Sequence, residues 1–179
     1  MFHITMFGGT EGVLPVSDFV SLTFFGGTEL KRPTLAQRML RLRDLRRQAP
    51  SAWRRIFQFD KNVIVTIFGS TEIYAPTVMD EYADLRRVIA SGVLAPDEGR
   101  QLLAELADRG GAHDLFSAIT LFGGCSVETP KPAEERKALE SGRQAGLIGD
   151  REHAVLDQVI GRSESAIASA LGQLAFAAV

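Results

Sequence analysis

The residues best able to bind a charged partner lie between positions 31 and 61. The whole chain of 179 residues has a formal net charge of −2, but this window is rich in lysine and arginine. Arginines beside aromatic rings suit an anionic membrane surface, and they also suit nucleic acid. An amphipathic helix whose arginines are merely solvated is the alternative. The candidate surface for an anionic partner consists of Arg38, Arg41, Arg46, Arg47, Trp53, Arg54 and Arg55.

Other chemistry has little support in the sequence. The three histidines, His3, His113 and His153, have no partners at metal-ligand spacing. The patterns HExxH, GxSxG, GxGxxG and Walker A do not occur. Cys125 is the single cysteine, which excludes an intramolecular disulfide and fits a reducing compartment. We therefore expect no enzyme activity, no small-molecule substrate, no cofactor and no metal site.

A short pattern recurs four times: Thr-x-Phe-Gly-(Gly/Ser)-(Thr/Cys)-(Glu/Ser)-x-x-x-Pro. We call each copy an FGG unit. Apolar, β-branched runs precede the glycines, so each unit predicts a strand, a corner and a second short strand. Proline then ends the second strand. The four phenylalanines are Phe7, Phe25, Phe68 and Phe122, and the matching prolines are Pro15, Pro33, Pro76 and Pro130.

Stacking of the FGG units predicts which side chains lie inside. We expect the four phenylalanines to form the core, and the threonines and glutamates of the units to point outward. Glu11, Glu29 and Glu72 occupy equivalent positions, so they predict an outward ladder of like charges instead of a general acid–base pair. Cys125 stands where the other units have threonine, and is interpreted as a small strand residue.

Helical segments separate the FGG units. Residues 34–57 form one, with Thr34 as its cap and an apolar stripe along Leu35, Met39, Leu42 and Leu45. Residues 78–90 predict a helix, and Pro96 opens the next one. The pattern that starts at Phe68 recurs from Phe122 onward with the same internal spacing, which predicts a second hairpin of the same design. Residues 163–179 predict a final helix.

Two family resemblances rest on these motifs. The segments Val20 to Pro33, Val63 to Pro76 and Ala118 to Pro130 resemble the C-terminal domain of LiaF-type bacterial proteins, which respond to cell-wall-active antibiotics. The sequences Gly92-Val93-Leu94-Ala95-Pro96-Asp97-Glu98 and Gly146-Leu147-Ile148-Gly149-Asp150-Arg151-Glu152 resemble SHOCT-type helical modules. The resemblance implies a β-solenoid-like sheet, a bacterial source and a non-enzymatic role in envelope stress or assembly. LiaF-type proteins usually carry transmembrane helices before this domain, and this sequence has none.

These observations predict an α/β (α+β) repeat: a small β-solenoid-like stack of FGG strand pairs with helical hairpins inserted between the units. The expected organisation is a single repeat domain over residues 1–179, with FGG units at 1–33, 62–76 and 115–130 and helical inserts at 34–60, 77–113 and 131–179. The expected function is a scaffold or regulatory adaptor that self-associates or docks a protein partner. The alternative is a peripheral binder of an anionic membrane surface or nucleic acid through residues 31–61. Since no signal peptide or apolar run of about 18 residues occurs, we expect a cytoplasmic protein, at the inner face of the membrane if the basic segment binds lipid.

Overall fold

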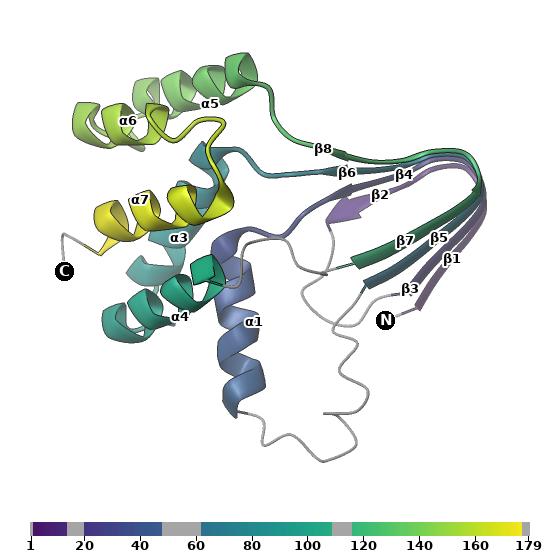
Figure 1. Ribbon diagram of the computed structural model, residues 1–179, viewed down its shortest axis with the longest axis horizontal. Helices are drawn as coiled ribbons and strands as arrows, with labels where there is room; N and C mark the ends of the chain where they lie inside the picture. The colour runs from purple at the N-terminus through teal and green to yellow at the C-terminus, as the bar shows by residue number, and fades with distance from the viewer. Residues whose placement is uncertain (1, 14–19, 48–61, 109–115, 177–179) are drawn as a thin grey trace. The chain divides into compact units, whose positions relative to one another are not determined.

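The computed structural model describes residues 2–13, 20–47, 62–108 and 116–176. The chain divides into two compact units (Figure 1). The sheet unit comprises Met1–Pro33, Asp44–Ala75 and Asp114–Thr129. The helical unit comprises Thr34–Arg43, Pro76–His113 and Pro130–Val179. The predicted FGG units and helical inserts largely separate into these two units.

The sheet unit contains two four-stranded parallel sheets, so the mixed α/β class is confirmed. Each FGG unit contributes one strand to each sheet, and the chain turns between the two strands at the glycines. The first sheet has the order β1-β3-β5-β7, and the second has the order β2-β4-β6-β8. Their bounds are β1 Phe2–Phe7, β2 Thr10–Val13, β3 Val20–Phe25, β4 Thr28–Lys31, β5 Asn62–Phe68, β6 Thr71–Tyr74, β7 Phe116–Phe122 and β8 Cys125–Glu128.

Equivalent positions of the four FGG units pair directly. In the first sheet Phe25 lies between Phe7 and Phe68, and Phe68 is also paired with Phe122. The connections between units have unequal lengths, since one joins Val13 to Val20 and the next joins Lys31 to Asn62. The strands nevertheless return to the same register after every connection. The register is therefore fixed by the repeated motif and not by the length of the connecting segment.

The helical unit contains six helices in the described part of the chain: α1 Leu35–Arg47, α3 Val78–Ala90, α4 Pro96–Asp108, α5 Pro132–Gln144, α6 Asp150–Asp157 and α7 Glu164–Ala175. Thr34 caps α1 as predicted, because its hydroxyl accepts the Gln37 amide and the Gln37 side chain accepts the Thr34 amide. The helices α3 and α5 begin and end at equivalent positions of the pattern that recurs from Phe122 onward. The helix α6 is shorter than its counterpart α4, because the chain turns at Gly161, with φ 71°, and α7 then begins.

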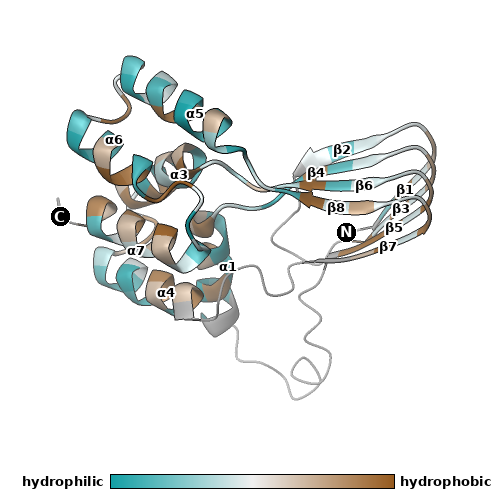
Figure 2. Ribbon diagram, turned by 45° about the horizontal axis from the view of Figure 1, so that its top comes forward, coloured by the Kyte–Doolittle hydropathy of each residue, from teal (hydrophilic) through white to brown (hydrophobic). Residues whose placement is uncertain are grey.

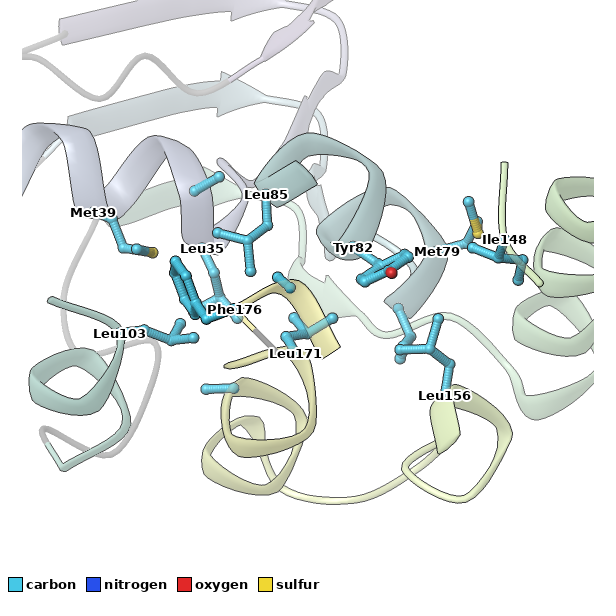
Figure 3. Close-up of a cluster of buried hydrophobic side chains, with 14 of the residues drawn as sticks. Leu35, Met39, Met79, Tyr82, Leu85, Leu103, Ile148, Leu156, Leu171 and Phe176 are labelled. Carbon is cyan, nitrogen blue, oxygen red and sulfur yellow. The ribbon is translucent and has the colours of Figure 1, made fainter. Parts of the chain in front are cut away.

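The core of the helical unit is a cluster of leucine, methionine and aromatic side chains (Figure 3). Leu171 of α7 lies among side chains from α1, α3 and α4, and Phe176 lies beside Leu35 and Leu103. Leu35 and Met39 are buried, as expected for the stripe on the first helical insert. The helix ribbons alternate between hydrophobic and hydrophilic residues (Figure 2), which is typical of helices with one buried face.

Successive helical inserts are joined by a recurring pair of polar contacts. A buried glutamate in the first turn of one helix accepts the first backbone amide of the preceding insert's helix. Glu81 accepts the amide of Leu35 at 2.6 Å, and Glu135 accepts the amide of Val78 at 2.8 Å. Each contact satisfies one of the amides that a helix N-terminus leaves unpaired.

In the second contact the side chain belongs to the preceding insert and the backbone group belongs to the following one. An arginine late in one helix donates to a carbonyl in the hairpin turn of the following insert. Arg43 donates to the Val93 carbonyl, and Arg86 donates to the Leu147 carbonyl at 2.9 Å. Since Val93 and Leu147 occupy equivalent positions of the repeated hairpin, these contacts are copies of one interaction.

Both contacts change at the ends of the helical series. The third helix begins with Pro132, which has no amide hydrogen and therefore needs no acceptor. Glu140 occupies the place of Arg43 and Arg86 and binds Arg143 instead. At the other end, Arg38 occupies the place of Glu81 and Glu135 and forms an ion pair with Glu164 of α7.

Candidate functional site

The corners of the FGG units bring successive backbones into close contact. The amide of Gly26 donates to the Phe68 carbonyl at 2.9 Å, and the same bond recurs one unit earlier and one unit later. A Cβ atom added at Gly69 would lie 2.1 Å from the Gly26 oxygen. Gly69 also has φ 147°, a conformation that glycine adopts at low cost. Gly26 and Gly69 are therefore required both by the turn and by the stacking distance.

A ladder of hydroxyl groups lies between the two sheets next to the corners. Facing threonines of one unit contact each other, and Thr10–Thr23 and Thr28–Thr66 join neighbouring units. Thr23, Thr28, Thr66 and Thr71 are all fully buried. A hydroxyl can donate and accept at once, so such a chain can satisfy its members internally. The oxygen–oxygen distances are 3.0 Å for Thr5–Thr10, 3.1 Å for Thr10–Thr23, 3.1 Å for Thr23–Thr28, 3.2 Å for Thr28–Thr66 and 2.8 Å for Thr66–Thr71.

The four phenylalanines form a second ladder on the outside of the corners. Their rings are stacked almost parallel, with centroid distances of 5.3, 5.1 and 4.9 Å along the series. The inner rings of Phe25 and Phe68 are each 45% exposed, whereas Phe7 and Phe122 at the two ends are 76% and 65% exposed. The outer rings are more exposed because each has a stacked neighbour on one side only.

This arrangement reverses the predicted interior. The prediction that Phe7, Phe25, Phe68 and Phe122 form the core is wrong, and so is the prediction that the threonines point outward. The physical reason is the width of the interior at the corner. Thr23 and Thr28 face each other there at hydrogen-bonding distance, which leaves no room for an aromatic ring. The small apolar core lies further from the corner and contains Leu30, Ile64 and Ile73.

The glutamate positions form a ladder along the second sheet, with Glu11, Glu29 and Glu72 in register. Glu11 and Glu29 are exposed and Glu72 is half-buried. Tyr74 donates to the Glu72 carboxylate at 2.5 Å, and this hydrogen bond, with smaller contributions from desolvation and the charges of Glu72, Glu29 and Glu128, raises the pKa of Tyr74 to about 12. The ladder is thus a charged outer surface.

Among the described strands, both sheets end in edge strands that pair on one side only, at β1 and β2 on one side and at β7 and β8 on the other. These edges expose apolar side chains: Ile4 and Met6 on β1 are 54% and 53% exposed, and Leu121 on β7 is 60% exposed. Val127 on β8 is 50% exposed, although Leu30 and Ile73 at the same register position are buried. The two edges are therefore surfaces of the kind that the units bury when they pair.

The last unit also ends the hydroxyl ladder. Cys125 is exposed and occupies the position of Thr71, and the buried Thr120 hydroxyl has no hydrogen-bond partner within the part of the chain that the structure describes. The sequence contained a signal for this ladder, because threonine recurs on both arms of three FGG units. The signal was missed because the large aromatic rings were expected to fill the core. Alternation along a regular strand would place Thr23 and Phe25 on the same face, but the chain leaves that regularity at the corner, so only Thr23 is buried.

The structure separates the predicted anionic-partner residues. Arg38 is 6% exposed and is engaged by Glu164, so its assignment to a free cationic surface is wrong. Arg41 is half-buried and Arg47 is exposed. The side chain of Arg46 and all of Trp53, Arg54 and Arg55 lie outside the described residues, so for them binding of lipid or nucleic acid stays a prediction.

The remaining sequence candidates are dispersed. His3 lies on β1 at the open edge, and the imidazole of His153 lies 3.8 Å from Glu140 in the helical unit. His113 lies outside the described residues. Within the described ranges, no group of three or more histidine, cysteine, aspartate or glutamate side chains is arranged to hold a metal ion.

Among the helices of the described residues, none combines the length and the apolar character needed to cross a membrane. Comparison with protein-family models, with curated proteins and with solved structures found no match. The two open sheet edges are therefore the candidate functional site.

Proposed function

We propose that this protein is a non-enzymatic scaffold or regulatory adaptor that acts by self-association or by docking a protein partner. We also propose that its two parallel sheets form a small β-solenoid-like stack of FGG strand pairs, with the open edges as binding surfaces. The observation that carries the proposal is the exposure of apolar side chains on unpaired edge strands at both ends. Such edges offer backbone hydrogen-bonding groups and apolar contacts to another strand.

The repeat supports this proposal. Within the chain, each inner strand pairs with a neighbour on both sides, and its inward side chains are buried by those neighbours. A fifth strand pair placed on the β7–β8 edge would bury Val127 in the same way, and one placed on the β1–β2 edge would partly cover Ile4, as neighbouring strands partly cover Leu22. Buried apolar area is the main favourable contribution to most associations of this kind.

The resemblance to LiaF-type domains and SHOCT-type modules supplies a proposed setting. It supports a role in a bacterial response to envelope stress, which would lie at the inner face of the membrane if the basic segment at residues 31–61 binds lipid. In that setting the sheet edges bind another protein or another copy, and the helical inserts carry the regulatory contacts.

Sedimentation velocity over a wide range of protein concentration tests the proposal. We expect the weight-average sedimentation coefficient to rise with concentration. Replacement of an edge residue, Val127→Lys, should abolish the rise, while Leu147→Lys should not. Leu147 is a suitable control because it is 54% exposed and lies in the helical unit. A protein that stays monomeric throughout and binds no partner through these edges would contradict the proposal.

A further inference from the structure

We propose that the partner of each open edge is the opposite edge of a second copy of this chain. The β7–β8 edge of one copy joins the β1–β2 edge of the next, in the parallel register that already joins the FGG units. This inference rests on the proposed self-association and adds its polarity and register. Its basis is that the two edges of one copy complement each other in backbone, side chains and shape.

The backbone complementarity is visible at the corners. In every unit the corner amides donate toward the following unit: Gly69 to the Phe122 carbonyl at 3.1 Å, and Thr71 to the Gly124 carbonyl at 2.8 Å. The equivalent amides of the last unit belong to Gly123 and Cys125. No described unit follows them, so at the corner this edge presents two amide donors.

The first unit presents the matching acceptors. The amides of Gly8 and Thr10 donate to carbonyls of the second unit, at 2.9 Å each. The carbonyls of Phe7 and Gly9 face the other way, at the positions where Phe25 and Gly27 accept. A head-to-tail junction therefore places the amides of Gly123 and Cys125 on the carbonyls of Phe7 and Gly9 of the next copy.

The side chains of the two edges continue the existing ladders. Phe122 and Phe7 are the most exposed rings of the series, and the junction stacks one on the other as Phe25 stacks on Phe68. Cys125 would then contact Thr5 of the next copy, as Thr28 contacts Thr66 within the chain. These are the contacts that any inner unit makes with its neighbours.

The shapes also match at the position that forms the apolar core. This position holds Gly12, Leu30, Ile73 and Val127 along the four units. The exposed Val127 of one copy would cover Gly12 of the next, so a large side chain meets the smallest one. At the corner, a Cβ on Gly8 would meet no atom within 4 Å, whereas one on Gly26 would meet the oxygen of Gly8 at 2.0 Å. Gly8 thus leaves room for the carbonyl of a preceding Gly123.

A two-fold symmetric dimer fits these edges less well. In such a dimer an edge would meet its own copy, so the corner amides of Gly123 and Cys125 would not meet the corner carbonyls of Phe7 and Gly9, and the other edge of each copy would stay open. A head-to-tail contact is heterologous, so every added copy leaves the same two edges free. The expected assembly is therefore linear and has a direction.

Two variants at the shared core position separate these possibilities. Gly12→Lys places an ammonium group on the β1–β2 edge, and Val127→Lys places one on the β7–β8 edge. Each ammonium reaches solvent in the single copy and would be buried without a partner in a junction, which is strongly unfavourable. Circular dichroism and thermal unfolding establish that each variant folds, and Leu147→Lys is again the control.

Sedimentation velocity on the two variants gives the decisive pattern. Each variant alone should be monomeric, because every junction needs both edges. An equimolar mixture should form a one-to-one dimer that grows no further, since each copy keeps one intact edge. If either variant alone still dimerises, the head-to-tail inference is overturned while self-association stands. If the unaltered protein is monomeric at every concentration, the proposed self-association fails as well.

A cross-linking measurement tests the register and does not depend on the lysine variants. In Thr5→Cys, the new thiol and Cys125 lie on opposite edges of one copy and meet only in a head-to-tail junction. Mild oxidation with diamide should give a ladder of disulfide-linked chains. Mass spectrometry should then find the peptide that carries the Thr5→Cys substitution linked to the peptide that contains Cys125. Linkage through Cys125–Cys125 alone, which stops at a dimer, would overturn the proposal.

Discussion

The sheet unit and the helical unit are both built from successive copies of one pattern, but the copies at the ends of the two series differ in how far they keep that pattern. In the sheet unit the end strands β1 and β7 keep the motif of the inner strands, so their unpaired groups are those that join one unit to the next. In the helical unit the end copies are altered. Pro132 lacks the amide that Leu35 and Val78 donate, and Glu140 replaces the bridging arginine.

The difference teaches how a repeated contact is terminated. A contact made by the backbone and by identical side chains can continue beyond the chain, because its end members still carry the groups that join the units. A contact made by one donor and one acceptor on different copies stops when either member is replaced. The contacts between helical inserts therefore stop within the chain, whereas we propose that the sheets are extended by another copy of the chain.

The largest expected effect comes from breaking the corner. Gly69→Ala places a Cβ 2.1 Å from a backbone oxygen and forces alanine into a positive φ. We expect the free energy of unfolding to fall by at least about 4 kcal/mol, or the sheet unit to remain unfolded. Urea denaturation followed by circular dichroism measures this.

The matched control for the corner is Gly124→Ser. Ser70 already occupies the equivalent place in the third unit, and a Cβ at Gly124 would meet no atom within 4 Å. Its stability should stay within about 0.5 kcal/mol of the unaltered protein. A large loss for Gly124→Ser, or none for Gly69→Ala, would contradict the stacking argument.

The second effect tests the hydroxyl ladder. Thr66→Val keeps the shape of the side chain but deprives the buried hydroxyls of Thr28 and Thr71 of a partner. We expect a loss of about 1–3 kcal/mol in the free energy of unfolding. A fourfold variant should lose less free energy of unfolding than Thr66→Val alone, because it removes donors and acceptors in pairs. This variant converts Thr23, Thr28, Thr66 and Thr71 to valine. If the fourfold variant is the less stable of the two in chemical denaturation, the ladder is not the reason for these threonines.

The third and smallest effect concerns the contact between helical inserts. Glu135→Leu leaves the buried Val78 amide without its acceptor and should cost about 1–2 kcal/mol. Lys137 on the same helix is exposed, so Lys137→Leu should change the free energy of unfolding by less than about 0.5 kcal/mol. Equal losses in thermal unfolding of the two variants would show that Glu135 does not join the inserts.

Glu135→Gln sharpens this prediction through its pH dependence. Burial raises the pKa of Glu135, while the hydrogen bond from the Val78 amide acts in the opposite direction. Because the folded-state pKa lies above the unfolded value, the contribution of Glu135 is complete below its usual pKa and is lost as the pH rises through the folded-state value. Glutamine keeps an acceptor and does not titrate, so the variant should gain stability relative to the unaltered protein over the pH range that begins at about pH 4. A constant difference in urea denaturation across this range would contradict the assignment.

Much of the fold could be predicted from the sequence because its signals are local. The helix at Val78–Ala90 and the start of the next helix at Pro96 agree with the expected bounds, since caps and apolar spacing define them. The recurrence of the same pattern from Phe122 onward also predicts the bounds of α5. The FGG units form the expected strand pairs, because β-branched runs flank the glycines.

Which face of each strand points to the interior could not be predicted in the same way. Whether Phe25 or Thr23 lies inside depends on the width between two sheets, which no single strand contains. The burial of Arg38 depends on Glu164, more than a hundred positions later in the chain. Sequence patterns identify the elements, whereas the candidate surface is defined by which groups the stacking of units leaves unpaired.

The unequal connections between FGG units have a practical consequence. The segment between Val13 and Val20, that between Lys31 and Asn62 and that between Tyr74 and Phe116 all leave the strand register unchanged. We therefore expect that foreign sequence can be inserted at the end of the second strand of an FGG unit. A reporter peptide or a small domain inserted there should be tolerated by the sheets, and new inserts could be acquired in evolution without rebuilding the stack that carries them.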